Sequence, residues 1–283
     1  MERKILIILV IGILLFGAVY GYYYHHWKHL WAVSKTLPYY PVSNKQDDTL
    51  RVVMIGDSWA GIHTELGMDA FLESQLGNLL MCPVKVWSKG KGGEKSRGIY
   101  KLMFQMEGYG TKPLILQGAD YCIISAGIND AAANLGMKQF VAHYKMILDF
   151  LLVNHIRPVI IEIPDVDIWN IYGNKGKKDL LSDFVKSTMT GCRMYHFHEY
   201  REALLEMLHD CNLMQQVLYV PMTLWNGEGV EINPSLFVED KIHLNRRGYE
   251  RLDSSIATAI VKDLQQTEHS TLVNQPMCQD AEN

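Results

Sequence analysis

Residues 51–59 have the sequence Arg51-Val52-Val53-Met54-Ile55-Gly56-Asp57-Ser58-Trp59. Four apolar residues in a row, rich in β-branched side chains, predict a strand buried in a parallel sheet. Polar residues follow at once, and a helical pattern begins at Gly61. In an open α/β sheet, ligands and reacting groups collect at the carboxyl ends of the strands. Ser58 would lie there beside unpaired helix N–H groups, although Gly-Asp-Ser is also ordinary turn and helix-cap chemistry.

From Leu50 onward, short apolar runs alternate with amphipathic stretches. This alternation is typical of successive βα units and predicts a parallel sheet of about five strands. The expected strands are Arg51–Ile55, Val84–Trp87, Tyr121–Ser125, Val159–Ile163 and Val217–Val220. The expected helices are Gly61–Leu80, Arg97–Glu107, Lys138–Asn154, Glu199–Asp210 and 247–265. Residues 165–194 interrupt the rhythm, and we expect there either a substrate-binding loop or a solvated surface insertion.

Length and composition indicate one folded domain. The chain has 283 residues, 48% of them hydrophobic, which is enough for one good core. A formal net charge of -4 and the lack of a basic stripe argue against nucleic acid as a partner. The five cysteines are too few and too scattered for a disulfide scaffold, and none forms a Cys-x-x-Cys pair. Pairing of Cys192 with Cys211, which bracket a helical segment, is left open.

The N-terminus predicts a membrane anchor. About 20 uncharged residues, from Ile5 to Tyr24, follow Arg3 and Lys4, which is long enough for a transmembrane helix. The positive-inside rule puts the short N-terminus in the cytoplasm and the rest of the chain outside it. Tyrosines and tryptophans at the end of this stretch would form an aromatic belt at the far interface. A cleaved signal peptide is the alternative, but no small-x-small cleavage site precedes the bulky aromatic run.

The chain therefore divides into four parts. Residues 1–31 would be the cytoplasmic stub, the transmembrane anchor and the aromatic belt. Residues 32–49 carry prolines and polar side chains without a period, and we expect a linker that holds the domain off the membrane. Residues 50–266 form the expected α/β domain. The polar tail, residues 267–283, is expected to be loose.

Two further strand ends carry groups suited to an oxyanion hole. Ser88-Lys89-Gly90-Lys91-Gly92-Gly93 follows the second strand, and its glycines let a backbone N–H approach a ligand closely. The spacing matches neither a dinucleotide-binding nor a phosphate-loop motif, and a simple surface loop is the alternative. The third strand ends in Ser125-Ala126-Gly127-Ile128-Asn129-Asp130. The Asn129 amide is suited either to donate to the same oxyanion or to cap the next helix.

A carboxylate and an imidazole lie close together near the C-terminus. Asp240 and His243 are three residues apart, just before the last expected helix. A turn of this length brings the carboxylate to one imidazole nitrogen and leaves the other free to take a proton from a serine. Such pairs also cap helices or lie in solvent, so the pair gains meaning only with the other blocks.

In order and spacing, these four blocks resemble the SGNH (GDSL-type) hydrolase family, across residues 50 to 265. The resemblance rests on Gly56-Asp57-Ser58, Gly93, Gly127-Ile128-Asn129-Asp130 and Asp240-Lys241-Ile242-His243-Leu244. It implies a flavodoxin-like three-layer α/β/α sandwich. It also implies Ser58 as the nucleophile, His243 as the general base and then acid, and Asp240 as the group that orients the imidazole. The oxyanion hole would consist of the backbone N–H groups of Ser58 and Gly93 and the Asn129 side chain.

The sequence departs from the family pattern at two places. Trp59 follows the serine where the family usually has Leu or a small residue, and we expect its ring to narrow or line the site. Ser88 stands where the family often has Asn before the glycine of the second block. Gly90 and Gly92 are alternatives to Gly93 as the glycine whose backbone N–H belongs to the oxyanion hole. Neither departure removes a member of the expected triad.

Other residues are candidates for binding rather than for chemistry. Trp169, Tyr172 and Trp225 would stack on a sugar substrate, and Asp57 either contacts substrate or, as we favour, stabilises the turn around the serine. A His-x-His pair at residues 196 and 198 has no evident third ligand, so we expect no metal, and the chemistry needs no organic cofactor.

The sequence thus predicts a membrane-anchored, extracytoplasmic serine esterase that acts through an acyl-enzyme. The expected location and the family's range favour an acylated saccharide, such as an O-acetylated carbohydrate, as the ester substrate. Two alternatives remain open. One is an O-acyltransferase that uses the same site on an envelope polysaccharide, and the other is a catalytically silent carbohydrate-binding relative.

Overall fold

A five-stranded, all-parallel sheet forms the centre of the molecule, with strands in the order β2-β1-β3-β4-β5. The structure is a computed structural model that describes residues 2–43, 45, 47–166, 175–227 and 232–273. The strands are β1 (Leu50–Gly56), β2 (Val84–Gly90), β3 (Tyr121–Ser125), β4 (Arg157–Ile161) and β5 (Leu218–Val220). This is a flavodoxin-like strand order. From β1 the chain adds β2 on one side of the sheet and then β3, β4 and β5 on the other, so the switch point lies between β1 and β3. The carboxyl ends of these two strands are therefore where a ligand crevice is expected.

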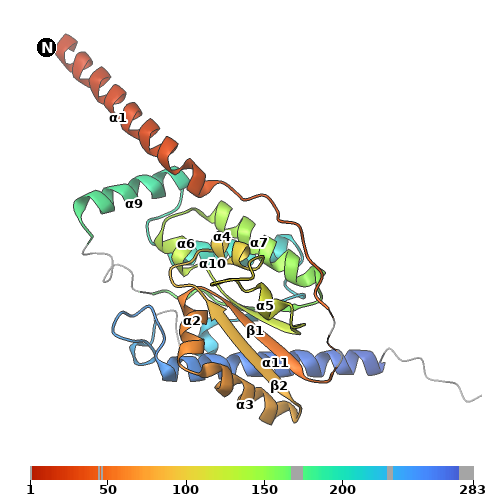
Figure 1. Ribbon diagram of the computed structural model, residues 1–283. Helices are drawn as coiled ribbons and strands as arrows, with labels where there is room; N and C mark the ends of the chain where they lie inside the picture. The colour runs from red at the N-terminus through yellow and green to blue at the C-terminus, as the bar shows by residue number, and fades with distance from the viewer. Residues whose placement is uncertain (1, 44, 46, 167–174, 228–231, 274–283) are drawn as a thin grey trace, which may run out of the picture.

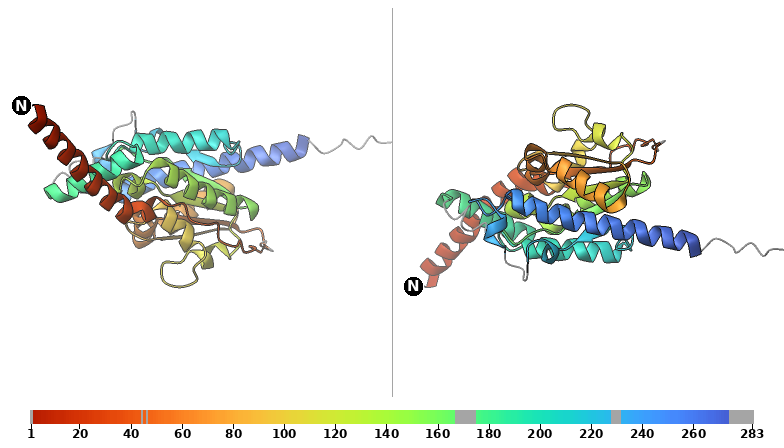
Figure 2. Two further views of the ribbon diagram at one scale, coloured as in Figure 1. Left: turned by 90° about the horizontal axis from the view of Figure 1, so that it is seen from above. Right: turned by 90° about the horizontal axis from the view of Figure 1, so that it is seen from below.

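Helices cover both faces of the sheet and complete a three-layer sandwich (Figure 1). One layer holds α2 (Ser58–Glu65), α3 (Met68–Leu80) and α11 (Arg246–Val273), and Figure 2 shows α11 running along the underside of the domain. The other layer holds α4 (Ser96–Leu102), α6 (Ile128–Ala132), α7 (Met137–Val153) and α10 (Phe197–Asp210). The short elements are α5 (Lys112–Ile115) and the 3-10 turns η1 (Met222–Leu224) and η2 (Pro234–Leu236). Because β1 lies between these layers, Val52 to Ile55 are completely buried.

The expected fold is confirmed, with changes at several boundaries. The helix predicted at Gly61–Leu80 is two helices, because Gly67 takes a left-handed conformation with a φ of 70° between α2 and α3. The helix predicted at Arg97–Glu107 ends at Leu102. The last helix continues to Val273, so the tail expected to be loose from Thr267 is helical over its first part.

One stretch contains a helix that we did not predict. The stretch from residue 165 to 194, expected to be a loop or surface insertion, contains the helix α9 (Lys177–Thr190). The buried positions of α9 are polar, Asp183 and Ser187, whereas Leu181 and Phe184 are exposed. Because two of its large apolar side chains point outward and its buried positions are polar, α9 does not show the pattern by which a core-facing helix is recognised.

The N-terminal segment forms one long helix, α1 (Glu2–Trp31), that projects from the domain (Figure 1). The helix over residues 3–31 is long and apolar enough to cross a membrane. No residue of its most apolar stretch is buried in the protein. Such a helix is compatible with a membrane anchor or with a signal sequence.

The segment expected to hold the domain off the membrane instead lies on the domain surface. Its backbone N–H groups donate to side chains of the domain: Ser34 to His143 Nε2 at 3.0 Å, and Leu37 to the Tyr100 hydroxyl at 2.7 Å. The Tyr40 ring packs on Phe150, with 4.7 Å between ring centroids. These contacts make residues 34–40 a strap along the domain and not a free spacer, because a solvated linker would leave these N–H groups to water.

The cysteines of the described residues carry free thiols. Cys192 is buried and contacts the Thr190 hydroxyl at 2.8 Å, and Cys211 is likewise unpaired. The pairing of these two cysteines, which the sequence left open, is therefore absent from this structure.

Candidate active site

Ser58 stands at the first position of α2, directly after the carboxyl end of β1. Asp57 caps this helix, since its Oδ1 accepts a hydrogen bond from the Trp59 N–H at 3.0 Å. The strand-to-helix turn leaves the serine side chain half-buried at the rim of the sheet. The Trp59 N–H is taken up by this cap, whereas the Ser58 N–H, at the first position of the helix, has no partner within the helix and is suited to an anion.

The loop before α11 brings an imidazole to this serine across 185 positions of sequence. His243 Nε2 lies 2.9 Å from Ser58 Oγ, and His243 Nδ1 lies 2.6 Å from Asp240 Oδ2. The other carboxylate oxygen of Asp240 accepts the N–H groups of Ile242 at 2.8 Å and His243 at 2.9 Å. The turn between Asp240 and His243 is thus fixed by the same carboxylate that contacts the ring.

This hydrogen-bonding sets the charge of Asp240. Partial burial raises the pKa of its carboxyl, but the His243 N–H, the His243 ring and the Ile242 N–H together lower the pKa below its usual value. Asp240 is therefore ionised at neutral pH and holds the proton of the imidazole on Nδ1. His243 Nε2 is then free to accept the Ser58 proton, as a general base must.

A cavity of about 240 Å³ opens in front of Ser58 and His243. It is lined by Ser58, Trp59, Gly92, Gly93, Ile128, Asn129, Ala132, Ile242 and His243. The expected nucleophile and base, Ser58 and His243, therefore line the same cavity as the residues expected for the oxyanion hole. Of the three glycines that competed for the oxyanion role, Gly92 and Gly93 face the cavity.

Gly90 has a packing role instead. A Cβ at this position would lie 2.0 Å from the Asp57 carbonyl oxygen and 2.6 Å from the Gly61 nitrogen. Only glycine allows the end of β2 to approach the first turn of α2 this closely.

Asp57 is a buried network residue and not a substrate contact. Its side chain is 1% exposed and accepts hydrogen bonds from the Ser125 hydroxyl at 2.9 Å and from Asn129 Nδ2 at 3.1 Å. Burial raises the pKa of Asp57 to about 6, although its hydrogen bonds and the nearby His243 oppose the rise. The carboxylate therefore orients the Asn129 amide, whose second N–H is left for a ligand.

Asp130 fixes the loop that carries the glycines, a role that we did not predict. Asp130 is completely buried and accepts the Ser96 N–H at 2.9 Å and the Ser96 hydroxyl at 2.7 Å. It thereby ties the end of the glycine loop to α6, which carries Asn129. Its place next to Asn129 in a Gly-Ile-Asn-Asp run was the only signal in the sequence.

The aromatic candidates differ in their surroundings. Trp59 lines the cavity, as expected, and its indole N–H donates to the Ile242 carbonyl oxygen at 3.0 Å. Trp225 is completely buried and packs edge-to-face on Trp59 at 5.9 Å, so the prediction that it stacks on a sugar was wrong. Trp169 and Tyr172 lie outside the described residues.

No cluster of three or more His, Cys, Asp or Glu side chains is arranged to hold a metal ion among the described residues. His196 precedes α10, and its ring lies 6.0 Å from that of His198.

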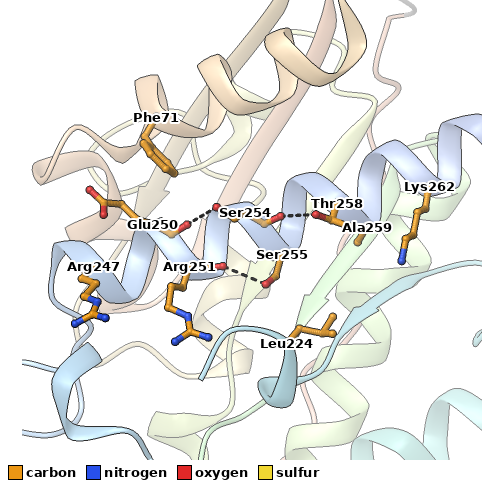
Figure 3. A pocket seen from close by; sticks show the side chains of 10 residues that line it. All are labelled: Phe71, Leu224, Arg247, Glu250, Arg251, Ser254, Ser255, Thr258, Ala259 and Lys262. Atoms are coloured by element: carbon orange, nitrogen blue, oxygen red, sulfur yellow. Dashed lines mark hydrogen bonds between the residues drawn. The ribbon is translucent and has the colours of Figure 1, made fainter. Parts of the chain in front are cut away.

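A larger cavity lies elsewhere, on the outer face of α11 (Figure 3). Its volume is about 720 Å³, and it contains none of the candidate catalytic or oxyanion-hole residues. The hydroxyl groups of Ser254 and Ser255 donate to helix carbonyls one turn back, those of Glu250 and Arg251. They serve the helix backbone, and no acid or base is paired with them, so we assign the chemistry to the smaller cavity at Ser58.

Fold and site together define a class by geometry: α/β proteins with a three-layer sandwich that carry a Ser-His-Asp arrangement at the carboxyl edge of a parallel sheet. Solved structures narrow this class. The fold matches a lipase/acylhydrolase from Enterococcus faecalis with a TM-score of 0.53 and 15% identity, over 76% of this chain and 96% of that one. It matches an acetyl-xylooligosaccharide esterase from Geobacillus with a TM-score of 0.51 and 17% identity, over 75% and 94% of the two chains.

An esterase from Pseudoalteromonas also matches, with a TM-score of 0.50 and 16% identity, over 77% of this chain and 100% of that one. The chain is thus similar in fold to solved esterases and acylhydrolases. No family model and no curated protein sequence matches the chain, so the likeness lies in the fold and in the four motif blocks.

Proposed function

We propose that this chain is a serine esterase of the SGNH type, with Ser58 as nucleophile, His243 as general base and Asp240 as the residue that orients the imidazole. One observation carries the proposal: Ser58 Oγ is 2.9 Å from His243 Nε2, while Asp240 Oδ2 is 2.6 Å from the other ring nitrogen. Distances of this size allow proton transfer without rearrangement.

The reaction follows from these contacts. Ser58 Oγ attacks the ester carbonyl as its proton moves to His243 Nε2, and the resulting oxyanion is held by N–H groups of Ser58 and Gly93 and by the Asn129 amide. The imidazolium gives its proton to the leaving alcohol, and an acyl-enzyme remains. Water then attacks the acyl-enzyme while His243 takes its proton. The imidazolium returns a proton to Ser58 Oγ, and the carboxylic acid is released. Neither step calls on a cofactor.

The size of the cavity supports a short acyl group. Its volume, about 240 Å³, is below the range of pockets that enclose drug-sized ligands. Trp59 and Ile242 border it, and they leave room for an acetyl group better than for a fatty acyl chain. The Geobacillus neighbour is an acetyl-xylooligosaccharide esterase, so we favour an acetylated carbohydrate as the substrate.

The N-terminal helix supports a location at a membrane. In this proposal residues 1–31 are a retained anchor with a cytoplasmic N-terminus, and residues 50–266 are the catalytic domain on the outer side. Arg3 and Lys4 before the span support this orientation by the positive-inside rule.

The test uses the full-length chain in detergent with p-nitrophenyl acetate, alongside the Ser58→Ala variant. We expect turnover by the wild type only, together with labelling of Ser58 by a fluorophosphonate. Turnover that survives Ser58→Ala would contradict the proposed nucleophile, and failure to label would favour a silent binding protein. Adding acetyl-accepting oligosaccharides separates hydrolysis from transfer, because an acyltransferase would place the acetyl group on the sugar.

A further inference from the structure

Helix α9 turns two of its large apolar side chains away from the protein, while Leu180, Val185 and Met189 are half-buried. Leu181 is 54% exposed and Phe184 is 59% exposed, and the two are three residues apart on one helix face. The buried positions of this helix are Asp183 and Ser187. A surface helix of a globular protein normally has the opposite arrangement, with its apolar stripe toward the core. The outer face of α9 is therefore suited to an apolar environment beyond the protein.

Ion pairs hold α9 in this orientation. Asp183 Oδ2 accepts from Lys175 Nζ at 2.7 Å, and Asp183 Oδ1 lies 3.2 Å from Lys186 Nζ. Asp183 also accepts a hydrogen bond from the Tyr195 hydroxyl. Lys186 is on α9 and would move with Asp183, but Lys175 and Tyr195 lie outside the helix. Rotating α9 to hide its apolar face would therefore take the buried Asp183 carboxylate away from these two partners. The contacts of Asp183 on the inner face of α9 thus keep Leu181 and Phe184 pointing outward.

Helix α9 lies against the end of α1, where α1 meets the domain (Figures 1 and 2). The Lys186 ammonium is 5.1 Å from the centre of the Trp27 ring, a cation–π contact, and Trp27 is only 8% exposed. The position of α9 along α1 is thereby set near Trp27.

That position corresponds to the headgroup layer of a membrane. The apolar stretch from Ile5 to Tyr24 is about 30 Å long as a helix, which equals the hydrocarbon thickness of a bilayer. Trp27 is three residues further on, so it lies roughly 4.5 Å beyond the hydrocarbon edge. The headgroup layer on each side is about 5–8 Å thick. A membrane spanned by α1 therefore reaches α9.

Positive charge surrounds the same region. Lys177 and Lys178 are exposed at the first turn of α9, where Asp179 is the one acidic residue, so the turn is positive on balance. A second group of cations borders a cavity of about 310 Å³ that includes Leu30 of α1: Lys91, Lys95, Arg97 and Lys101. Glu94 is the one acidic residue in this lining. Lysine and arginine side chains beside a membrane span are attracted to anionic lipid headgroups.

We propose that α9 is an interfacial helix that lies in the headgroup layer of the membrane spanned by α1, with Leu181 and Phe184 inserted toward the acyl chains. This inference rests on the proposed anchor role of α1. A single span leaves a domain free to tilt, whereas a second contact fixes its orientation. The Lys91–Lys95 segment, which borders the cation-lined cavity beside Leu30, also contains Gly92 and Gly93 of the catalytic cavity. The interfacial helix thus holds the catalytic cavity at a defined height above the lipid.

Photo-crosslinking in the full-length chain tests the inference. The photoreactive residue p-benzoylphenylalanine replaces one side chain at a time, at Leu14, Leu79 or Phe184, in protein reconstituted into nanodiscs that contain anionic and zwitterionic phospholipid. Leu14 lies in the span, and Leu79 is a matched control, since it is 53% exposed on α3, away from α1. After irradiation, mass spectrometry identifies what each position is bonded to. All three positions are exposed, so the fold is preserved.

We expect lipid adducts at position 184 in a yield comparable with position 14 and well above position 79. Adducts at 14 without adducts at 184 would overturn the interfacial role of α9 and leave the anchor proposal standing. An adduct of position 184 with a second copy of the chain would also overturn it, because the face would then be a protein interface. Absence of lipid adducts at 14 would remove the anchor and the inference together, while the esterase assay with Ser58→Ala would still report on the chemistry.

Discussion

The indole N–H of Trp59 donates to the carbonyl oxygen of Ile242 at 3.0 Å and so joins the residue after the candidate nucleophile to the residue before the candidate base. Two segments that are far apart in the chain are thereby fixed to each other beside the 2.9 Å contact between Ser58 Oγ and His243 Nε2. The indole is a positioning group in this arrangement, since it reaches the reacting atoms only through the backbone.

The first prediction concerns this link. Trp59→Phe keeps an aromatic ring but removes the indole N–H, so the Ile242 carbonyl oxygen loses its hydrogen-bond donor. The loss of one such bond costs about 1 kcal/mol of stability. We expect kcat for p-nitrophenyl acetate to fall while KM changes little, because the ester still enters the cavity but His243 is held less firmly. An unchanged kcat would show that the loop before α11 holds His243 without Trp59.

The second prediction concerns Asp240. Asp240→Asn preserves the side-chain size but replaces an acceptor with a group that cannot hold the proton on Nδ1 of His243. By analogy with other triads, we expect kcat/KM to fall by about 10²–10⁴. The ability of Ser58 to react with a fluorophosphonate should slow in parallel, and both rates are measured on the same preparation. Equal rates in wild type and variant would contradict the orienting role.

The third prediction concerns Asp57, which holds Asn129. Asp57→Asn places an amide against the amide of Asn129, so the hydrogen bond of 3.1 Å is lost and the proposed oxyanion donor turns away. Removing one such donor costs about 10²–10³ in kcat. Ser125→Ala is the matched control, because it removes another hydrogen bond to Asp57 without touching Asn129. If both variants lose the same activity, Asp57 acts by general support of the turn and not through Asn129.

The sequence allowed the fold and the residues around the cavity to be predicted, for a physical reason. Each strand end in a parallel sheet is marked by an abrupt change from apolar residues to glycine and polar residues, and all such ends meet at one edge. Ser58 and Asn129 could be placed there by this rule alone. Their catalytic roles stay a prediction until activity is measured.

What could not be predicted depends on tertiary contacts that leave no local pattern. Trp225 was a candidate for stacking on a sugar, but packing against Trp59 buries it. His63 gave no signal, although it is completely buried and joins three elements. Its partners are Asp69 on α3 and Ser88 on β2 at one ring nitrogen, and Asp253 on α11 at the other.

The fourth prediction concerns the pH dependence that His63 creates. Burial lowers the pKa of His63, but hydrogen bonds and charge from Asp253 and Asp69 raise it to about 9. Because the folded-state pKa exceeds the ordinary value of about 6.5, this stabilisation is complete below that value and is lost as pH rises through 9. The stabilisation is on the order of 3 kcal/mol.

Thermal unfolding of wild type and His63→Gln between pH 6.5 and 9.5 tests this dependence. We expect the wild-type Tm to fall over the interval by more than the Tm of His63→Gln, whose glutamine does not titrate. For a domain of this size, 1 kcal/mol corresponds to about 2–4 °C. Parallel curves for the two proteins would mean that folding does not raise the pKa of His63.

The fifth prediction concerns the close approach of β2 to α2. Gly90→Ala would put a methyl group 2.0 Å from the Asp57 carbonyl oxygen and 2.6 Å from the Gly61 nitrogen. Both contacts are with backbone, which cannot move aside as a flexible side chain does, so α2 must shift and carry Ser58 with it. Overpacking costs about 1–3 kcal/mol, and we expect a loss at the upper end of that range together with lower kcat. Gly92→Ala is the matched control for stability, since an added Cβ there meets no atom within 4 Å. A Gly90→Ala protein as stable as Gly92→Ala would show that the strand and helix can separate without cost, and that the serine does not depend on this contact for its position.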